Sequence, residues 1–358
     1  MKATHFCVIA VTIVASFLGI FTLVAGFNLG EGGASASRVA TFSTTDLNGA
    51  LSEADSDLLV SVNTKEYELI KTNDPFFDKQ WALEQMNITD LWNLTTDSKE
   101  VVIAILDTGI DSDHEDLQGK VVAEVNFTDS PSSNDINGHG THVAGIICAT
   151  ANNSIGVAGL VPSCKIMNVK VANDYGFCDE ATVARGIIWS VDHGAQVINI
   201  SLEIRNHSIT LEQAVNYAWD HGVLIITAAG NQGNKSAVYP AYYENSIAVA
   251  ATRPDETLAP LSNYGDWVDV AAPGYNIYST LPGNKYGYET GTSFATAYVS
   301  GLAAILSSVL SDMNGNGMLN DEVRSAIEKS CRQTNSTGYN FGIVNATAYI
   351  RQFVVTNP

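Results

Sequence analysis

Short apolar runs that alternate with helix-period segments constrain the fold of this chain more than any other feature. Five runs are typical of strands, and they occupy residues 101–106, 165–171, 197–202, 223–229 and 246–252. Between them, 179–195 and 210–221 repeat apolar residues at helical spacing. Apolar strands that alternate with helices predict a three-layer α/β fold, with a mostly parallel central sheet and helices on both faces.

In such sheets ligands bind at the carboxyl ends of the strands, and polar motifs occupy these positions. Asp107 ends a run in "VVIAILDTGID", and Asn231 follows another in "IITAAGNQG". His139 and His142 lie in "NGHGTHVAGII", where a helix pattern begins without the glutamate and spacing of a zinc-protease helix. Ser293 lies in "GTSFATAYVSG", before a helix expected over residues 294–309.

Each residue alone has an ordinary structural interpretation: a turn for Asp107 or Asn231, a helix-start histidine for His139, and a helix cap for Ser293. Two features point to chemistry instead. Free N–H groups at a helix start stabilise negative charge that develops beside Ser293. The amide of Asn231 can donate a hydrogen bond to an oxyanion without carrying a charge of its own.

Taken together, the motifs resemble those of the subtilases, the subtilisin-like serine proteases, and within them the thermitase and subtilisin branches. The resemblance covers residues 72 to 350 and implies a subtilisin-like fold and a serine endopeptidase that cleaves proteins or peptides. It implies that Ser293 is the nucleophile, that His139 is its general base and that Asp107 orients the imidazole. Asn231 and the N–H of Ser293 would bind the oxyanion of the acyl-enzyme pathway.

The resemblance also implies a substrate cleft in which the strand "NISLEI" pairs with the substrate backbone. The walls of the pocket for the P1 side chain, on the acyl side of the scissile bond, would be formed by Ser201, Leu202, Ala228, Ala229 and Gly230. Glu203 stands where the family commonly has glycine, and it adds bulk and negative charge to the rim. Val238 aligns near the pocket floor, where it would disfavour large aromatic P1 side chains.

Two positions after Ser293 depart from the family pattern GTSMAxPHVAG, with Ala297 in place of proline and Tyr298 in place of histidine. We expect retained activity, because alanine adopts the same helical geometry. Ala297 and Glu203 leave open a processing enzyme or transpeptidase that transfers the acyl group to an amine. A non-catalytic binding protein is a further alternative, against which the intact Asp107, His139, Asn231 and Ser293 argue.

The family resemblance also implies a structural calcium ion, held by oxygen atoms from separate segments. The matching carboxylates are Asp74 and Asp116, and the matching loop is "TANNSIGV". Its donors would be the side chain of Asn153 and the carbonyls of Ala151, Ile155 and Val157. A second candidate, 312–323, begins like an EF-hand loop, but Val323 occupies the twelfth position and Glu322 comes one residue early. A polar turn between helices, capped by Asn320, is the favoured interpretation there.

The N-terminus carries an uncharged, mostly apolar run from Phe6 to Leu29, followed by the small residues Ala34-Ser35-Ala36. The run predicts either a long signal peptide or an uncleaved membrane anchor over residues 1–36, and thus a secreted or extracytoplasmic protein. Residues 37–71 are expected to be a short propeptide of a zymogen, or a linker, and 72–358 the peptidase domain.

The net charge and the cysteines of the chain limit the nucleic-acid, metal and disulfide interactions that can be expected. The net charge of −20 excludes a nucleic-acid surface, which requires a basic footprint. Besides Cys7, the chain has Cys148, Cys164, Cys178 and Cys331, without a CxxC spacing that would indicate a metal. Three disulfide pairings of these four are possible, although Cys148 lies on an apolar helix pattern typical of a buried thiol. We expect a monomer.

Overall fold

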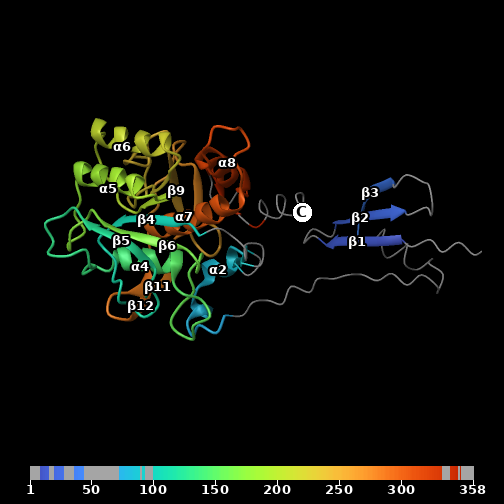
Figure 1. Cartoon of the computed structure of the whole chain (residues 1–358), viewed down its shortest axis with the longest axis horizontal. Coiled ribbons are helices and arrows are strands. Elements are labelled where there is room, and N and C mark those ends of the chain that lie inside the picture. Colours follow the sequence, from blue (N-terminus) through green and yellow to red (C-terminus); the bar gives the residue numbers. More distant parts are fainter. Residues whose placement is uncertain are drawn as a thin grey trace, which may run out of the picture. The chain divides into compact units, whose positions relative to one another are not determined.

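The computed structural model describes residues 72–88, 91–92, 100–332, 339–345 and 347, together with the backbone of three N-terminal strands (Figure 1). Those strands are β1 (Ile9–Ala15), β2 (Ile20–Phe27) and β3 (Ala36–Ser43), which pair antiparallel in that order. The chain divides into two compact units, Met1–Glu68 and Leu69–Pro358. Most of the predicted export segment and propeptide lies outside the described residues, so both remain predictions.

The second unit is built on an eight-stranded sheet of order β13-β10-β9-β8-β7-β4-β6-β5, in which every neighbouring pair is parallel. Its strands are β4 (Val102–Asp107), β5 (Val121–Asn126), β6 (Lys165–Lys170), β7 (Val197–Ile200), β8 (Leu224–Ala228), β9 (Ser246–Thr252), β10 (Val270–Pro273) and β13 (Gly342–Ile343). The five predicted strand runs correspond to β4, β6, β7, β8 and β9, which confirms the predicted parallel sheet.

Helices cover both faces of this sheet (Figure 1). Side chains from α5 (Glu180–Asp192) and α6 (Ile209–Asp220) share one apolar cluster with the sheet. The other cluster includes α4 (His139–Cys148), α7 (Thr292–Val309), α8 (Asn320–Ser330) and α2 (Trp81–Gln85). A 3-10 turn, Phe77–Lys79, precedes α2, and the hairpin of β11 (Ile277–Leu281) and β12 (Lys285–Glu289) follows β10.

Alternation along the strands produces the two packed layers. In β4, Ile103 and Ile105 face the cluster of α4 and α7, whereas Ala104 and Leu106 face the cluster of α5 and α6. Successive side chains of a strand point to opposite faces, so a strand between two helical layers is apolar at every position. Complete burial of each isoleucine or leucine contributes about 2 kcal/mol.

α7 is the one helix in the described part of the chain that is long and apolar enough to cross a membrane. Of its most apolar window, 83% is buried inside the protein, which is the environment of a core helix. Its apolar composition therefore reflects its position against the central strands.

The strand order opens a crevice at the carboxyl ends of the central strands. β6 and β7 flank β4 on opposite sides, so the chain connections depart in opposite directions beside β4. Such a switch point leaves a gap at the carboxyl ends of the strands, where ligands bind. Asp107 is the last residue of β4, and Ser201 follows the last residue of β7.

Candidate active site

Asp107 and His139 are joined by a hydrogen bond at this crevice. Asp107 is fully buried at the end of β4, and His139 is the first residue of α4. Nδ1 of His139 lies 2.7 Å from Oδ1 of Asp107, which also accepts the backbone N–H of Thr108 at 2.7 Å. Because Nδ1 faces a carboxylate it carries the proton, and Nε2 is left as the basic nitrogen.

Gly140 allows the first turn of α4 to pack directly against the end of β4. A Cβ atom at this position would lie 2.1 Å from the carbonyl oxygen of Gly109 and 3.1 Å from Cβ of Asp107. A backbone carbonyl cannot yield to the shorter contact without displacing its strand end. The glycine is therefore required for the approach that brings His139 within hydrogen-bond distance of Asp107.

Asp135, which belongs to none of the sequence motifs described above, holds the start of α4 in place. Its Oδ1 accepts the hydroxyl of Thr108 and the N–H of Gly138, both at 2.9 Å. Its Oδ2 accepts the N–H of Thr141 at 2.9 Å and the hydroxyl of Thr141 at 2.7 Å. The N-cap residue Gly138 has no side chain, so the buried carboxylate of Asp135 accepts two of the free N–H groups at this helix start, those of Gly138 and Thr141.

The two histidines of the motif have opposite environments. Burial lowers the pKa of His139, but the charge and hydrogen bond of Asp107, with the charges of Asp135 and Glu289, raise it above the ordinary value of 6.5. For the fully buried His142, burial lowers the pKa to about 3. Its Nε2 lies 3.1 Å from the carbonyl oxygen of Ile277. His142 is thus a neutral core residue, and His139 alone faces the crevice.

Ser293 lies at the start of α7 but does not cap it, so that interpretation was wrong. The helix begins at Thr292, two residues before the expected start, and its N-cap residue is Gly291. The hydroxyl of Ser293 donates to the carbonyl oxygen of Ser201 at 3.1 Å. As a first-turn residue, Ser293 keeps a backbone N–H that has no partner within the helix.

A buried chain of hydrogen bonds fixes this turn to the sheet. The hydroxyl of Ser201 donates to the carbonyl oxygen of Ser293 at 3.0 Å and accepts from Nδ2 of Asn199 at 2.9 Å. Oδ1 of Asn199 accepts the hydroxyl of Ser300 at 2.9 Å. The neighbouring Phe294 packs its ring 5.5 Å from that of His139. Polar residues inside the apolar run "VINISL" and inside the apolar helix were the sequence signal for this network.

The side chain of Asn231 is oriented by Thr292. Its Oδ1 accepts the backbone N–H of Thr292 at 2.9 Å and the hydroxyl at 3.1 Å. A backbone N–H can only donate, so the amide oxygen must face Thr292 and the NH2 group must face the other way. Asn231 therefore has a donor available beside the start of α7.

A cleft of about 270 Å³ brings these groups together, with His139, Asn231 and Ser293 on its wall. Three predicted substrate-binding residues also line it, namely Ser201, Leu202 and Glu203. The remaining lining residues were not predicted, and they are Thr108, Asn137, Gly176 and Cys178. The cleft thus joins the ends of β4 and β7 and the segments that follow β6 and β8 to the starts of α4 and α7.

The other predicted pocket residues do not line this cleft. Ala228, Ala229 and Val238 are buried, and Gly230 turns the chain with a φ of +97°. Val238 packs with Ala241 and Ala248 in a small apolar cluster. Their contribution to a P1 pocket remains a prediction.

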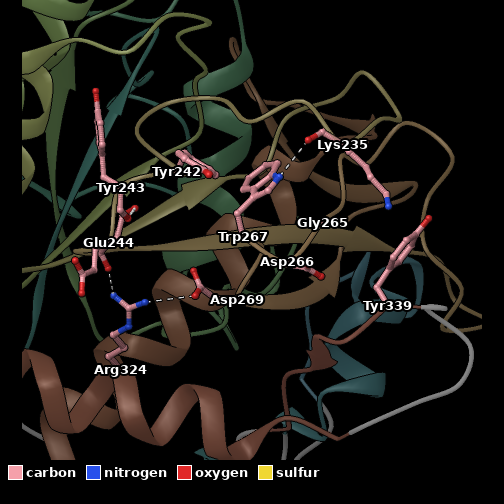
Figure 2. A pocket seen from close by; sticks show the side chains of 12 residues that line it. Lys235, Tyr242, Tyr243, Glu244, Gly265, Asp266, Trp267, Asp269, Arg324 and Tyr339 are labelled. Atoms are coloured by element: carbon pink, nitrogen blue, oxygen red, sulfur yellow. Dashed lines mark hydrogen bonds and ion pairs between the residues drawn. The ribbon is translucent and has the colours of Figure 1, made fainter.

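A second cavity, of about 700 Å³, lies at the opposite edge of the sheet, beside the amino ends of β9 and β10 (Figure 2). The carboxylate of Asp269 and the carbonyl of Glu244 both accept hydrogen bonds from Arg324, as Figure 2 shows. None of the predicted site residues lines this cavity. The larger of the two cavities therefore contains none of the predicted residues, whereas His139, Asn231 and Ser293 line the smaller cleft.

The residues predicted to hold calcium lie together. Asp74 accepts the backbone N–H groups of Asn152 and Asn153 at 2.9 and 3.1 Å. Asp116 accepts Nδ2 of Asn153 at 2.7 Å and the N–H of Val157 at 2.8 Å. The loop that both carboxylates contact also contains the two remaining predicted donors, Ala151 and Ile155.

The chemistry of this group suits a hard cation. Both carboxylates are buried, and burial, with a smaller contribution from the charge of Asp74, raises the pKa of Asp116. Oxygen-rich, anionic surroundings drawn from separate segments are what calcium binds. In the described ranges no cluster of three or more His, Cys, Asp or Glu side chains forms a metal site, so a cation here would depend on carbonyl and amide oxygens.

The segment 312–322 forms a polar turn after α7 that runs into the first residues of α8. Asp312 accepts the N–H groups of Gly315 and Gly317 at 2.7 and 2.8 Å. The predicted cap at Asn320 was wrong: α8 has Leu319 at its N-cap, and Asn320 donates from Nδ2 to the carbonyl of Trp219 at 2.9 Å. The described cysteines are Cys148, Cys164, Cys178 and Cys331, and all four are free thiols.

Comparison with known proteins agrees with this geometry. The model of the subtilase family matches residues 98–344. The thermophilic serine proteinase of Bacillus sp. (strain AK1) is 43% identical over 278 residues, which cover 76% of this chain and 68% of that protein. Thermitase of Thermoactinomyces vulgaris is 42% identical over 279 residues, covering 77% of this chain and 97% of thermitase.

Subtilisin Savinase of Lederbergia lenta is 40% identical over 272 residues, which cover 76% of this chain and 98% of that protein. The similar region extends over most of the second unit, which carries the cleft and its polar groups. The chain therefore belongs to the subtilase family and is a subtilisin-like serine endopeptidase.

Proposed function

We propose that Asp107, His139 and Ser293 are the catalytic triad of this endopeptidase. The observation that supports it most directly is the 2.7 Å contact between Nδ1 of His139 and Oδ1 of Asp107, at a cleft that Ser293 also lines. The contact leaves Nε2 of His139 to act as general base. Asp107 orients the ring and stabilises the cation that forms during proton transfer.

Acylation begins when the hydroxyl of Ser293 leaves the carbonyl of Ser201 and turns toward Nε2 of His139. Oγ attacks the substrate carbonyl as its proton passes to the imidazole, and His139 then gives this proton to the departing amine. Water then attacks the acyl-enzyme as His139 takes one of its protons. His139 returns this proton to Oγ of Ser293 as the peptide leaves with a new carboxyl end. The network from Ser201 to Ser300 stays in place during both steps, because it uses the carbonyl and not the hydroxyl of Ser293.

The tetrahedral oxyanion is bound by the NH2 group of Asn231 and the backbone N–H of Ser293. The bonds from Thr292 hold the amide of Asn231 in its donating orientation before the substrate arrives. Donors that need no reorientation stabilise charge in the transition state at little cost.

The test of this function is labelling with a fluorophosphonate, which reacts with activated serines. We expect labelling of the wild-type protein and its loss in the Ser293→Ala variant, with parallel loss of casein hydrolysis. Ser307→Ala is a matched control, because it removes a serine hydroxyl from the same helix, one that bonds to the carbonyl of Ala303 within that helix and lies outside the network around Ser293. Labelling that persists in Ser293→Ala would exclude Ser293 as the nucleophile.

We further propose a structural calcium ion held by Asp74, Asp116 and oxygen atoms of Ala151, Asn153, Ile155 and Val157. The ion would supply positive charge between buried carboxylates, and it has no part in the acyl-transfer steps.

We also propose that the protein is exported. Sequencing the N-terminus of the mature protein would distinguish a cleaved signal peptide from a retained membrane anchor. A peptide digest with an added amine, followed by mass spectrometry, would detect acyl transfer in place of hydrolysis.

A further inference from the structure

Glu203 bridges the two chain segments that enclose one end of the catalytic cleft. It follows β7, and its Oε1 accepts Nε2 of Gln232, from the segment after β8, at 2.5 Å. Its Oε2 lies against Gly230, where a Cβ atom would stand 2.8 Å away. Glu203 also lines the cleft itself. The carboxylate therefore lies on the cleft wall, between the segment that follows β7 and the segment that follows β8.

The second oxygen of this carboxylate, Oε2, has no hydrogen-bond partner in the described part of the chain. It is also shielded from solvent. A buried charged oxygen that lacks a donor carries a large desolvation penalty. Oε1 already has its donor in Gln232, so the unmet demand is confined to Oε2, the atom beside Gly230.

No positively charged side chain of the described structure meets this demand. Glu203 belongs to none of the ion pairs among the described residues, and neither Lys nor Arg lines the cleft. Arg205, two residues further on, is exposed and forms no described ion pair. The surroundings are anionic instead. Burial, and then the charges of Asp107, Asp179 and Glu203, raise the pKa of the cleft thiol Cys178 to about 11.

The position of Glu203 identifies which substrate residue would reach it. The carbonyl under attack lies between the N–H of Ser293 and the amide of Asn231, and Gly230 immediately precedes Asn231. The side chain attached to that carbonyl is the P1 side chain, and the space open to it includes the cleft wall that Glu203 forms, with Oε2 against Gly230.

Building on the proposed function, we propose that Glu203 selects a lysine or arginine side chain at P1. The ammonium or guanidinium donates to Oε2, while Oε1 keeps its hydrogen bond from Gln232. The alternative is that the hydrogen bond between Glu203 and Gln232 only shortens the P1 pocket, which would then admit small side chains such as alanine. The unpartnered Oε2 favours the basic side chain, because a small apolar one would leave this oxygen buried and unsatisfied.

The experiment compares kcat/KM for peptide substrates that are identical except for arginine, citrulline or alanine at P1. Citrulline has the shape of arginine without its charge, so the arginine-to-citrulline ratio isolates the charge. We expect a ratio of roughly ten- to a hundredfold in the wild-type protein. It should fall to near one in Glu203→Gln, in which the amide oxygen can still accept from Gln232. Inhibition by benzamidine, a small cation, should weaken in the same variant.

Glu212→Gln is the matched control, because Glu212 is a partly exposed carboxylate paired with His207 and does not line the cleft. It should keep the wild-type ratio. Fluorophosphonate labelling of Ser293 in Glu203→Gln verifies that the site is folded. A wild-type preference for alanine or citrulline over arginine, or a ratio unchanged by Glu203→Gln, would overturn the proposal. Absence of both labelling and cleavage of any substrate would instead overturn the proposed function, and the P1 proposal with it.

Discussion

Nδ1 of His139 lies 2.7 Å from Oδ1 of Asp107, and this contact favours the protonated form of His139, the proposed general base. Burial lowers the pKa of His139, but the charge and hydrogen bond of Asp107, together with the charges of Asp135 and Glu289, outweigh it and raise the pKa above 6.5. The base must be neutral to accept a proton, so activity is lost as the pH falls through this raised pKa. We expect the acid limb of kcat/KM, measured on a substrate with neutral P1, to lie above pH 6.5.

Asp107→Asn tests the same contact. The amide cannot hold the required tautomer, and kcat should fall roughly 10⁴-fold, the size of the loss seen for this change in other serine proteases. The residual activity should show an acid limb at lower pH, because burial then dominates the pKa of His139. An acid limb at or below pH 6.5 in the wild-type protein would contradict the proposed coupling.

Asn231→Ala removes the predicted oxyanion donor. We expect kcat to fall roughly 10²- to 10³-fold with little change in KM, because the lost bond forms only in the transition state. Thr292→Val removes one of the two bonds that orient Asn231 and keeps the other, from the backbone N–H. Its loss of kcat should therefore be several times smaller. Steady-state kinetics on one peptide would show whether this order holds.

Asp135→Asn should destabilise the protein. The carboxylate accepts four hydrogen bonds, from Thr108, Gly138 and Thr141, and an amide would direct two N–H groups at existing donors. We expect the free energy of unfolding to fall by about 2–3 kcal/mol. Urea unfolding should be measured in a Ser293→Ala background, which prevents self-digestion. An unchanged midpoint would show that the start of α4 does not depend on Asp135.

The sequence predicted those parts of the site that local pattern encodes. Asp107 and Asn231 follow apolar strand runs, and the carboxyl ends of parallel strands share one edge of the sheet. Asp135 gave no such signal, because its partners come from the end of β4 and the first turn of α4, which meet only in the folded protein. The bond of Ser201 to Ser293 also joins distant segments, and its sequence signal was limited to the polar residues inside "VINISL" and inside the apolar helix.

The fold was predicted to a similar extent. The central strands are buried on both faces, so their apolar runs are continuous. β5 was missed because it is an edge strand in which exposed and partly exposed residues alternate, and β10 because it is short and ends in proline. The early start of α7 followed from Gly291, since a glycine N-cap carries no side-chain signal.

Removal of calcium should lower the stability of the wild-type protein. With free calcium at a hundredfold excess over Kd, binding contributes about 2.7 kcal/mol, which EGTA would abolish. The melting temperature of Ser293→Ala should fall on chelation, whereas Ser293→Ala/Asp116→Asn should be unaffected by it. Asp321→Asn is the matched control, because Asp321 is a carboxylate in the first turn of α8 and is not among the proposed calcium ligands. Equal effects of EGTA with and without Asp116 would contradict the proposed site.

Cys178 provides a thiol probe of the cleft. It lines the same space as His139 and Ser293, and burial, then neighbouring carboxylates, raise its pKa to about 11. Only the thiolate reacts with iodoacetamide, so alkylation should be slow at pH 7 and rise about tenfold per pH unit up to that pKa. Alkylation should abolish peptide hydrolysis, because the adduct occupies the cleft, and Cys178→Ser should resist inactivation.

Two other thiols serve as internal controls. Cys331, whose pKa is raised to about 12 mainly by burial, should react more slowly than Cys178. The fully buried Cys148 should react only after unfolding. Peptide mapping by mass spectrometry distinguishes the three thiols, and modification of Cys178 without loss of activity would place it outside the substrate path.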